Sequence, residues 1–288
     1  MRTIGRACNT FARNYLIRNY LSFIDFIKTV TKPSGVLRYG EYIRSIDLTL
    51  VNKYGIDMRV SQLIRRCPNI RTMTLGHPTS VQPDTIGLIA KYCRKLHTFN
   101  IGGLESWPFM LECDFSGLKQ LHTIHFSTTP LMAHSLYTLP TRTLRHVCLE
   151  KMDALTVDEL RIFLKNRPNI ETLAILHCRR LTKDLGTVIS SKIGGTLDQL
   201  ELAGSQITDD NIRRMFQEQG HLSVLRLHRT WITDATLEAI RTGRLFIKHL
   251  DISYNKHITN EAVKALFVSF RGRMTLNVSG CDQVDVSL

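Results

Sequence analysis

One apolar pattern recurs along most of this chain, and it constrains the fold more than any other feature. Apolar residues occupy the first, fourth and sixth positions of a short segment, as in Leu197-Leu200-Leu202. The pattern starts at residues 43, 70, 96, 121, 144, 170, 197, 222 and 247, and a weaker copy starts at Arg273. Successive starts lie 23–27 residues apart. Such even spacing indicates one structural unit repeated about ten times.

Each copy contains the parts of a strand–turn–helix unit. The alternating apolar residues predict short parallel strands with one buried face, at residues 46–48, 73–75, 99–101, 124–126, 147–149, 173–175, 200–202, 225–227 and 250–252. An apolar residue followed by threonine predicts a helix N-cap at Thr156, Thr182, Thr208, Thr233 and Thr259. Glu159 would complete a capping box with Thr156. Between residues 96 and 140, glycines and prolines predict loops or short turns instead.

Units of this length and content are leucine-rich repeats. One unit cannot bury its own apolar edge, so stacked units share a continuous core. The chain is therefore predicted to be an α/β leucine-rich-repeat solenoid. Its curved, right-handed strand–helix repeats of about 26 residues would place a parallel sheet on the concave face. We expect residues 41–288 to form about ten repeats, and residues 1–40 to form an N-terminal helical cap.

Small polar or thiol side chains follow the third apolar residue by three positions in the later copies. They are Cys178, Ser205, Thr230, Asn255 and Cys281. Because such side chains can hydrogen-bond backbone groups in a turn, we expect them to close the turn between strand and helix.

The copies NIETLAILHCRRLTKDL, HLSVLRLHRTWITDATL and HLDISYNKHITNEAV resemble the cysteine-containing leucine-rich repeats of F-box/leucine-rich-repeat proteins. Cys67 and Cys93 also match that family's helix-end cysteine. The stretch RACNTFARNYLIRNYLSF resembles the last helix of an F-box, with Cys8, Phe11, Tyr15 and Leu16 at helical spacing. We also expect a helix over residues 8–26. Its side facing water would carry Arg13, Arg18 and Asn19, and its side turned toward the first repeats would carry Phe11, Tyr15, Leu16, Phe23 and Phe26.

The resemblance implies a substrate-recognition subunit of an SCF-type ubiquitin ligase. In that family the repeats hold a target, while the F-box docks on the Skp-type linker of a cullin ligase. A full F-box needs roughly two more helices upstream, so the stretch is identified as a truncated F-box remnant. We therefore expect residues 1–288 to bind such a linker weakly.

Two other functions remain open. The first 24 residues are rich in arginine and lack acidic residues, as a mitochondrial presequence would. A stand-alone adaptor or scaffold, such as a mitochondrial assembly factor, is therefore one alternative. The net charge of +13 makes a non-specific nucleic-acid binder the second. Nucleic acid is the weaker alternative, because no run of basic residues with interleaved aromatics occurs.

Compartment and assembly follow from the same composition. No apolar run is long enough to span a membrane, and no secretory signal is recognisable. The seven cysteines are then expected to be reduced thiols of a cytoplasmic or nuclear protein, or of a mitochondrial one. We expect a monomer outside its complex.

Strand positions between the buried ones point to the concave face. Early copies place small neutral side chains there, including Thr72, Thr98 and Ser127. Later copies place charged and aromatic side chains on it or at its rim. Because Trp, Tyr and Arg are the usual anchors of interfaces, we predict that a protein partner binds His146, Glu150, Glu201, Arg226, His228, Arg229, Trp231, His249, Asp251 and Tyr254.

Catalytic and metal chemistry has little support in the sequence. No nucleophile elbow, phosphate loop or zinc-protease motif occurs, so neither an enzyme nor a cofactor is expected. The pairs His122/His125 and His228/His249 lack cysteines or carboxylates at zinc-ligand spacing, and no metal is expected. Cys148 would be reactive only if a cation lowered its pKa, and a space-filling role is favoured.

Overall fold

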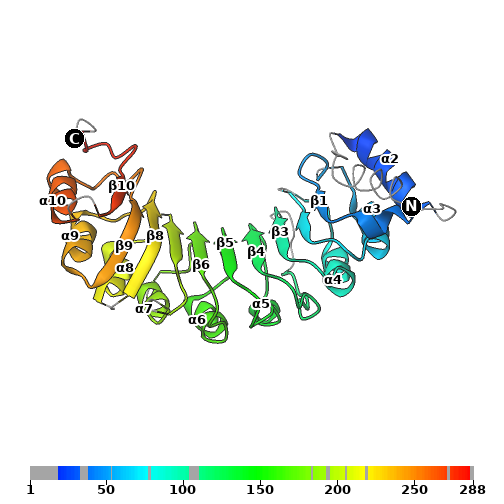
Figure 1. Ribbon diagram of the computed structural model, residues 1–288, viewed down its shortest axis with the longest axis horizontal. Coiled ribbons are helices and arrows are strands. Elements are labelled where there is room, and N and C mark those ends of the chain that lie inside the picture. The colour runs from blue at the N-terminus through cyan, green and yellow to red at the C-terminus, as the bar shows by residue number, and fades with distance from the viewer. Residues whose placement is uncertain are drawn as a thin grey trace. The chain divides into compact units, whose positions relative to one another are not determined.

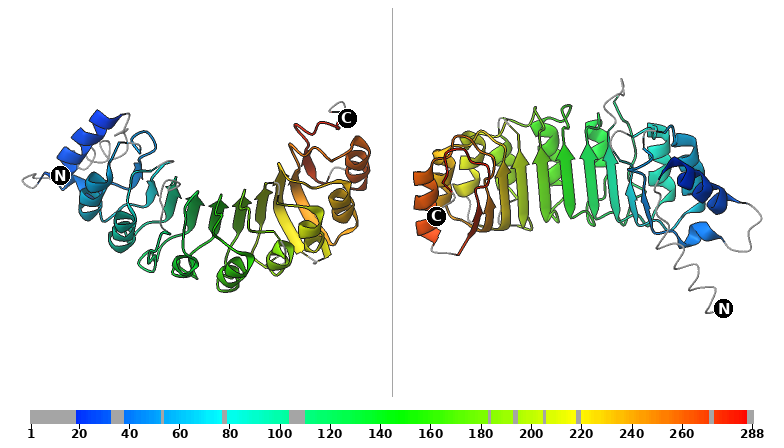
Figure 2. Two further views of the ribbon diagram at one scale, coloured as in Figure 1. Left: turned by 180° about the vertical axis from the view of Figure 1, so that it is seen from behind. Right: turned by 90° about the horizontal axis from the view of Figure 1, so that it is seen from above.

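The computed structural model describes residues 19–32, 38–52, 54–76, 79–103, 110–182, 184–192, 195–204, 206–217, 220–270 and 273–285. The chain divides into two compact units, residues 1–144 and 145–288. In each unit, strands of one parallel sheet alternate along the chain with helices that lie on one side of that sheet (Figures 1 and 2).

The described part of residues 1–144 holds four strands, each paired in parallel with the next along the chain. They are β1 (Ser45–Asp47), β2 (Thr72–Thr74), β3 (Thr98–Gly102) and β4 (Thr123–Ser127). The helices are α2 (Tyr20–Thr31), η1 (Tyr39–Tyr42), α3 (Asp57–Arg66), α4 (Pro83–Tyr92) and the short α5 (Ala133–Tyr137). Aligned residues Ile46, Met73, Phe99 and Ile124 are buried and form the sheet side of the core.

Residues 145–288 repeat this arrangement, with six parallel strands among their described residues. The strands are β5 (His146–Glu150), β6 (Thr172–Leu176), β7 (Gln199–Ala203), β8 (Gly220–His228), β9 (Leu245–Asp251) and β10 (Thr275–Asn277). The helices are α6 (Val157–Lys165), α7 (Leu185–Ser190), α8 (Asp209–Arg213), η2 (Met215–Gln217), α9 (Asp234–Thr242) and α10 (Asn260–Phe270).

The predicted strands are confirmed, because every one overlaps an observed strand and oversteps it by at most one residue. Strands β8 and β9 are longer than expected and extend toward their N-terminal ends, where Leu222 aligns with Ile247. Both residues are buried. The added pairing extends the core by one further apolar contact between these repeats.

Of the predicted turn-closing side chains, Cys178 and Asn255 act as expected and also join successive repeats, whereas Ser205 lies outside the described residues. The thiol of Cys178 donates to the Leu149 carbonyl, with 3.3 Å between Sγ and O. The side chain of Asn255 reaches the carbonyls of Leu227 and Ile252 at 2.6 and 2.8 Å, and it accepts from the Thr230 amide at 2.8 Å. Both side chains are fully buried, so these bonds satisfy backbone groups that water cannot reach.

Helix starts agree with the threonine rule except at one repeat. Thr156 and Glu159 form the predicted capping box, and Thr233 caps α9. Thr182 does not cap α7, so that prediction is wrong. The N-cap of α7 is Asp184, which has a left-handed φ of 63°. This extra turn moves the helix start two residues beyond the expected position.

The N-terminal cap was predicted partly correctly. Phe23 and Phe26 of α2 are buried, as expected. The continuous helix over 8–26 is wrong at Asn19, which is extended and caps α2 through a bond from the Ser22 amide to Oδ1 at 2.9 Å. The remnant residues Cys8, Phe11, Tyr15 and Leu16 lie outside the described residues. The division at residues 40 and 41 stays a prediction.

The irregular segment after β4 contains a short helix where only loops or turns were expected. Helix α5 forms because its polar side chains support the preceding loop. Ser135 Oγ accepts from the Cys113 amide at 2.9 Å, and Thr138 Oγ1 accepts from the Phe115 amide at 2.8 Å.

The described cysteines are free thiols, and most are buried. Burial raises the pKa of Cys67 and of Cys93 to about 12, so these thiols stay protonated and unreactive at neutral pH. We therefore expect that a reducing agent leaves the melting temperature unchanged in a thermal scan. A drop of several degrees on reduction would instead reveal a structural disulfide.

Candidate functional site

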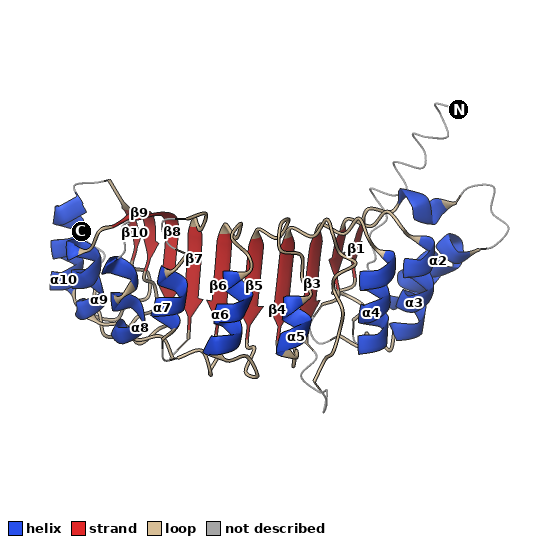
Figure 3. Ribbon diagram, turned by 90° about the horizontal axis from the view of Figure 1, so that it is seen from below, coloured by secondary structure: helices blue, strands red, loops and turns tan. Residues whose placement is uncertain are grey.

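The exposed face of the sheet in residues 145–288 carries a row of side chains that align across neighbouring strands. From β7 to β10 the aligned residues are Glu201, Arg226, Asp251 and Asn277. Their neighbours along each strand point into the core, because side chains alternate between the two faces of a strand. The row therefore places one cation between two carboxylates on the face opposite the helices (Figure 3).

Glu201, at the β7 end of this row, contacts two basic side chains of β8. Its carboxylate lies 2.9 Å from Nε2 of His228 and 3.7 Å from a guanidinium nitrogen of Arg226. Glu201 and His228 are each about one-quarter exposed, and Arg226 is 39% exposed. Partly exposed pairs of this kind contribute less than about 1 kcal/mol to folding. Their main effect is to hold Arg226 and His228 in place above the sheet.

Asp251 provides the second carboxylate. Its oxygens accept from the Ser253 amide at 2.9 Å and from Nδ2 of Asn277 at 3.0 Å. Burial alone would raise the pKa of Asp251, but the bonds from Ser253 and Asn277 and the nearby His228 outweigh it, so the pKa is lowered. Asp251 is thus ionised at neutral pH. Beside it, a shallow depression of about 390 Å³ is lined by Arg226, His249 and Asn277, among others.

Aromatic side chains border the row where the strands end. The guanidinium of Arg229 lies 5.1 Å from the ring centre of Tyr254, a cation–π contact. Trp231 is 61% exposed and Tyr254 is 53% exposed. A Cβ added to Gly280 would lie 2.5 Å from the Tyr254 ring, so this glycine lets the ring rest on the backbone. Large aromatic surface is thus held exposed and in a fixed orientation.

The ten predicted site residues do not form a single cluster. Eight lie on β7–β9 or on the turns that follow them, and Figure 3 labels these strands. His146 and Glu150 lie on β5, two strand spacings or roughly 10 Å from β7. His146 lies 3.0 Å from the Thr172 hydroxyl, and His249 bonds Thr275. Both histidines therefore belong to a second row that faces the same side.

The structure also shows contacts that sequence reasoning missed. His257 packs against Trp231 with 5.7 Å between ring centres, and Asn277 binds Asp251. Lys151 and His177 have left-handed backbones directly after β5 and β6. Alignment of the repeats could have identified Lys151 and His177 from the sequence, because glycine occupies the equivalent position in other copies, as at Gly204.

The corresponding face in residues 1–144 is chemically plain. Thr72 and Thr98 align across β2 and β3, and both are half-buried. Ser127 is buried, so the expectation that it is exposed is wrong. The Thr129 hydroxyl donates to the Ser127 carbonyl at 3.0 Å in the turn that follows β4. Among the described residues of β1–β4, the side chains on this face include no tryptophan, tyrosine or arginine.

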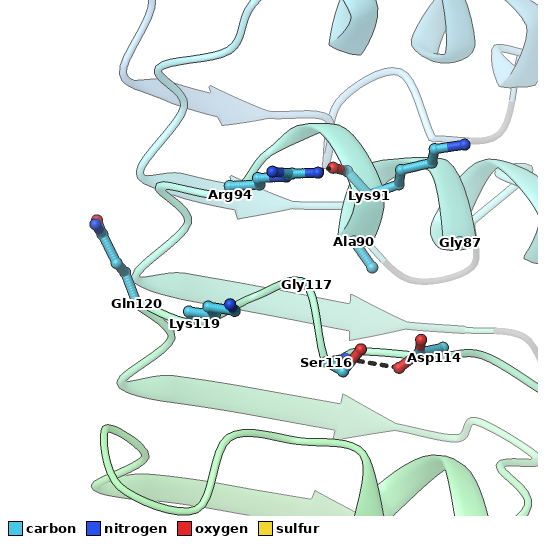
Figure 4. Close-up of a pocket in the computed structure, with 9 residues that line it drawn as sticks. All are labelled: Gly87, Ala90, Lys91, Arg94, Asp114, Ser116, Gly117, Lys119 and Gln120. Carbon is cyan, nitrogen blue, oxygen red and sulfur yellow. Dashed lines mark hydrogen bonds between the residues drawn. The ribbon is translucent and has the colours of Figure 1, made fainter.

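A larger cavity of about 620 Å³ lies on the helix side of residues 1–144 (Figure 4). Lys91, Arg94 and Lys119 line it, together with Asp114. The Ser116 amide donates to the Asp114 carboxylate at 2.8 Å and, with the Ser116 side chain, lowers the pKa of Asp114. The cavity holds no nucleophile paired with a base, so its size does not make it a catalytic site.

Metal and thiol chemistry find little support in the described part of the chain. No three His, Cys, Asp or Glu side chains gather there as metal ligands. His122 stacks on His97 with 5.2 Å between ring centres, and His228 is engaged by Glu201. Burial, followed by the charges of Glu150 and Glu201, raises the pKa of Cys148 to about 12, which contradicts a reactive thiolate.

Among the described residues, no helix combines the length and the apolar character that crossing a bilayer requires.

Comparison with known proteins agrees with this architecture. A family model described as "Leucine Rich repeat" matches residues 245–267. No curated protein matches the chain. A chain in the crystal structure of the Rad7 and Elc1 complex in yeast is 12% identical, with a TM-score of 0.59, over 98% of this chain and 72% of that one. The leucine-rich repeat-containing protein LegL7 from Legionella pneumophila is 14% identical, with a TM-score of 0.52, over 85% of this chain and 84% of that one.

At these identities the likeness concerns the fold alone. The matched segment 245–267 contains β9 and most of α10, which together form one repeat. Parallel strands that alternate with helices, spaced as the apolar pattern predicted, complete the evidence. The chain is therefore an α/β leucine-rich-repeat solenoid.

Proposed function

We propose that this protein recognises a target protein on the exposed sheet face of β7–β10, as the target-binding subunit of an F-box-type ubiquitin ligase. The observation that carries target binding is the exposure of Trp231 and Tyr254 beside Arg226 and Arg229. Tryptophan, tyrosine and arginine supply most of the binding energy in protein interfaces. A surface that holds them in fixed positions loses little conformational entropy when it binds.

The charge pattern favours binding of a specific partner over non-specific binding. Arg226 stands between the carboxylates of Glu201 and Asp251, so a matching partner must place an acidic group opposite the arginine and basic groups beside it. Such alternating charges reject mismatched partners, because like charges would be brought together.

The ligase role rests on two further observations. The first is the resemblance of residues 6–23 to the last F-box helix. The second is that the Rad7 neighbour was crystallised in complex with a second protein, Elc1. We place this protein in the cytoplasm or nucleus on the same basis. The alternative is a stand-alone adaptor, including a mitochondrial one, and the experiment must distinguish it from a ligase subunit.

The linker interaction tests the ligase role directly. We expect the cellular product of this gene to co-purify with a Skp-type linker and a cullin, whereas purified residues 1–288 bind the isolated linker with a Kd weaker than about 10 μM. The matched variants are Phe11→Glu with Leu16→Glu, on the expected apolar side of the helix, and Arg13→Gln with Arg18→Gln, on its polar side.

Each result has a distinct meaning. Tight binding by residues 1–288 that is lost in the first variant pair alone would show that the remnant suffices, contrary to our expectation. Absence of linker and cullin from the cellular complexes would reject the ligase role. Delivery of a reporter to mitochondria by residues 1–30 would then favour the adaptor.

A further inference from the structure

One backbone position adopts a left-handed conformation in every described copy from the third strand onward. It lies two residues after the third apolar residue of each repeat. Glycine fills it at Gly103, Gly204 and Gly280, whereas Thr128, Lys151, His177, Arg229 and Tyr254 fill it elsewhere, with φ between 48° and 58°.

Glycine is the residue that this position favours. A Cβ in the left-handed region crowds the backbone, and glycine avoids the crowding. Since Gly204 and Gly280 occupy the position in residues 145–288, the repeat fold does not need a side chain there. The four non-glycine residues in that unit therefore keep a strained left-handed backbone that glycine would relieve without loss of the fold. Strain kept in this way is typical of functional positions.

These four residues, Lys151, His177, Arg229 and Tyr254, form what we call the ledge. Each donates its amide to a carbonyl of the following repeat, at distances of 2.8, 2.7, 3.2 and 2.9 Å in that order. The ledge runs along the edge where the strands end, marked by the arrowheads of β5–β9 in Figure 3. Its four strand spacings cover about 19 Å, the length of roughly six residues of an extended peptide.

The ledge is basic and accessible. Lys151, Arg229 and Tyr254 are exposed, and His177 is half-buried. The cation–π contact with Tyr254 holds Arg229 in place. The turns beyond the ledge add the exposed cations Arg179, Arg180 and Lys256. The acidic residue Asp153 is already engaged by the Arg179 amide at 3.2 Å.

We propose that the ledge binds an acidic, extended segment of the target protein, whose carboxylates pair with Lys151 and Arg229 while an apolar side chain packs on Tyr254. This inference rests on the proposed target binding and names the chemistry of that target. Arginine and lysine pair with carboxylates, and the exposed ring of Tyr254 gives the segment an apolar contact beyond the charges.

The probe is a fluorescein-labelled 12-residue peptide in which glutamate alternates with leucine, measured by fluorescence anisotropy. The test variant combines Lys151→Gly, Arg229→Gly and Tyr254→Gly. We expect its melting temperature to equal or exceed that of the wild type, because glycine relieves the left-handed backbone. We expect its affinity for the peptide to fall at least about tenfold, because two charge pairs are lost.

Thr128→Gly is the matched control. Thr128 has the same left-handed backbone in residues 1–144, and among the described residues its buried hydroxyl has no hydrogen-bond partner. We expect this variant to raise the melting temperature and to leave peptide affinity unchanged.

Two results would overturn the proposal. One is unchanged peptide affinity in the triple glycine variant, and the other is a lower melting temperature, which would give the ledge a structural role. Equal binding of a single-stranded oligouridylate, lost in the same variant, would replace the acidic segment with a phosphate polyanion. If Arg226→Ala and Trp231→Ala weaken an identified target and Lys151→Gly does not, the proposed function stands and the ledge inference alone fails.

Discussion

Replacing Asn255 with alanine is expected to lower the free energy of unfolding by about 3–5 kcal/mol. The substitution leaves the carbonyls of Leu227 and Ile252 and the amide of Thr230 without their side-chain partner, in a fully buried turn. Each buried polar group that loses its hydrogen bond costs about 1–3 kcal/mol. Urea unfolding followed by circular dichroism measures the change.

Asn255→Cys is the matched control, because cysteine fills the same repeat position at Cys178 and Cys281. Their thiols donate to the carbonyls of Leu149 and Ile252 at 3.3 and 3.2 Å. We expect the cysteine variant to recover a substantial part of the loss. A destabilisation below about 1 kcal/mol for Asn255→Ala would show that these bonds do not hold the repeats together.

The second large effect concerns binding. We expect Arg226→Ala, Trp231→Ala or Tyr254→Ala to weaken an identified partner by about 1–4 kcal/mol each, because such residues dominate interface energetics. Thr72→Ala and Thr98→Ala serve as controls and should change affinity by less than about 0.5 kcal/mol. Isothermal titration calorimetry with the partner measures both sets. Equal losses in the two sets would mean that the site is wrongly placed.

The fold was predictable because its signals are local and repeated. The apolar residues of β6, Leu173 and Ile175, follow the alternating spacing of a strand, and this spacing recurs in each repeat. Thr156 and Glu159 lie three residues apart, so the capping box can be identified without knowledge of tertiary structure.

The errors arose where one residue has two possible roles. Asn19 suits either a polar helix face or an N-cap, and its bond from the Ser22 amide decides for the cap. Thr182 suits a cap, but left-handed Asp184 starts the helix later. Burial at a strand end was equally hidden, because alternation predicts an exposed Ser127 and the folded chain buries it.

The candidate site was predictable as a face but not as a network. Alternation along the strands placed Glu201, Arg226 and Asp251 on one side. The register between neighbouring strands aligns Arg226 with both carboxylates. The network could not be predicted, because repeat lengths alone do not fix the distances between side chains. The ledge was missed because Lys151 and His177 are unremarkable residues until their φ angles are known.

Site-specific photo-crosslinking tests the central claim, target recognition on the sheet face of β7–β10, most directly. Benzoylphenylalanine would be placed singly at Trp231 and His249 on or beside that face, at Thr98 on the β3 face, and at the exposed Phe267 on α10. Crosslinks to one target protein from Trp231 and His249, without crosslinks from Thr98 or Phe267, are the predicted result. Crosslinks from Thr98 or Phe267 at equal or greater yield would contradict it.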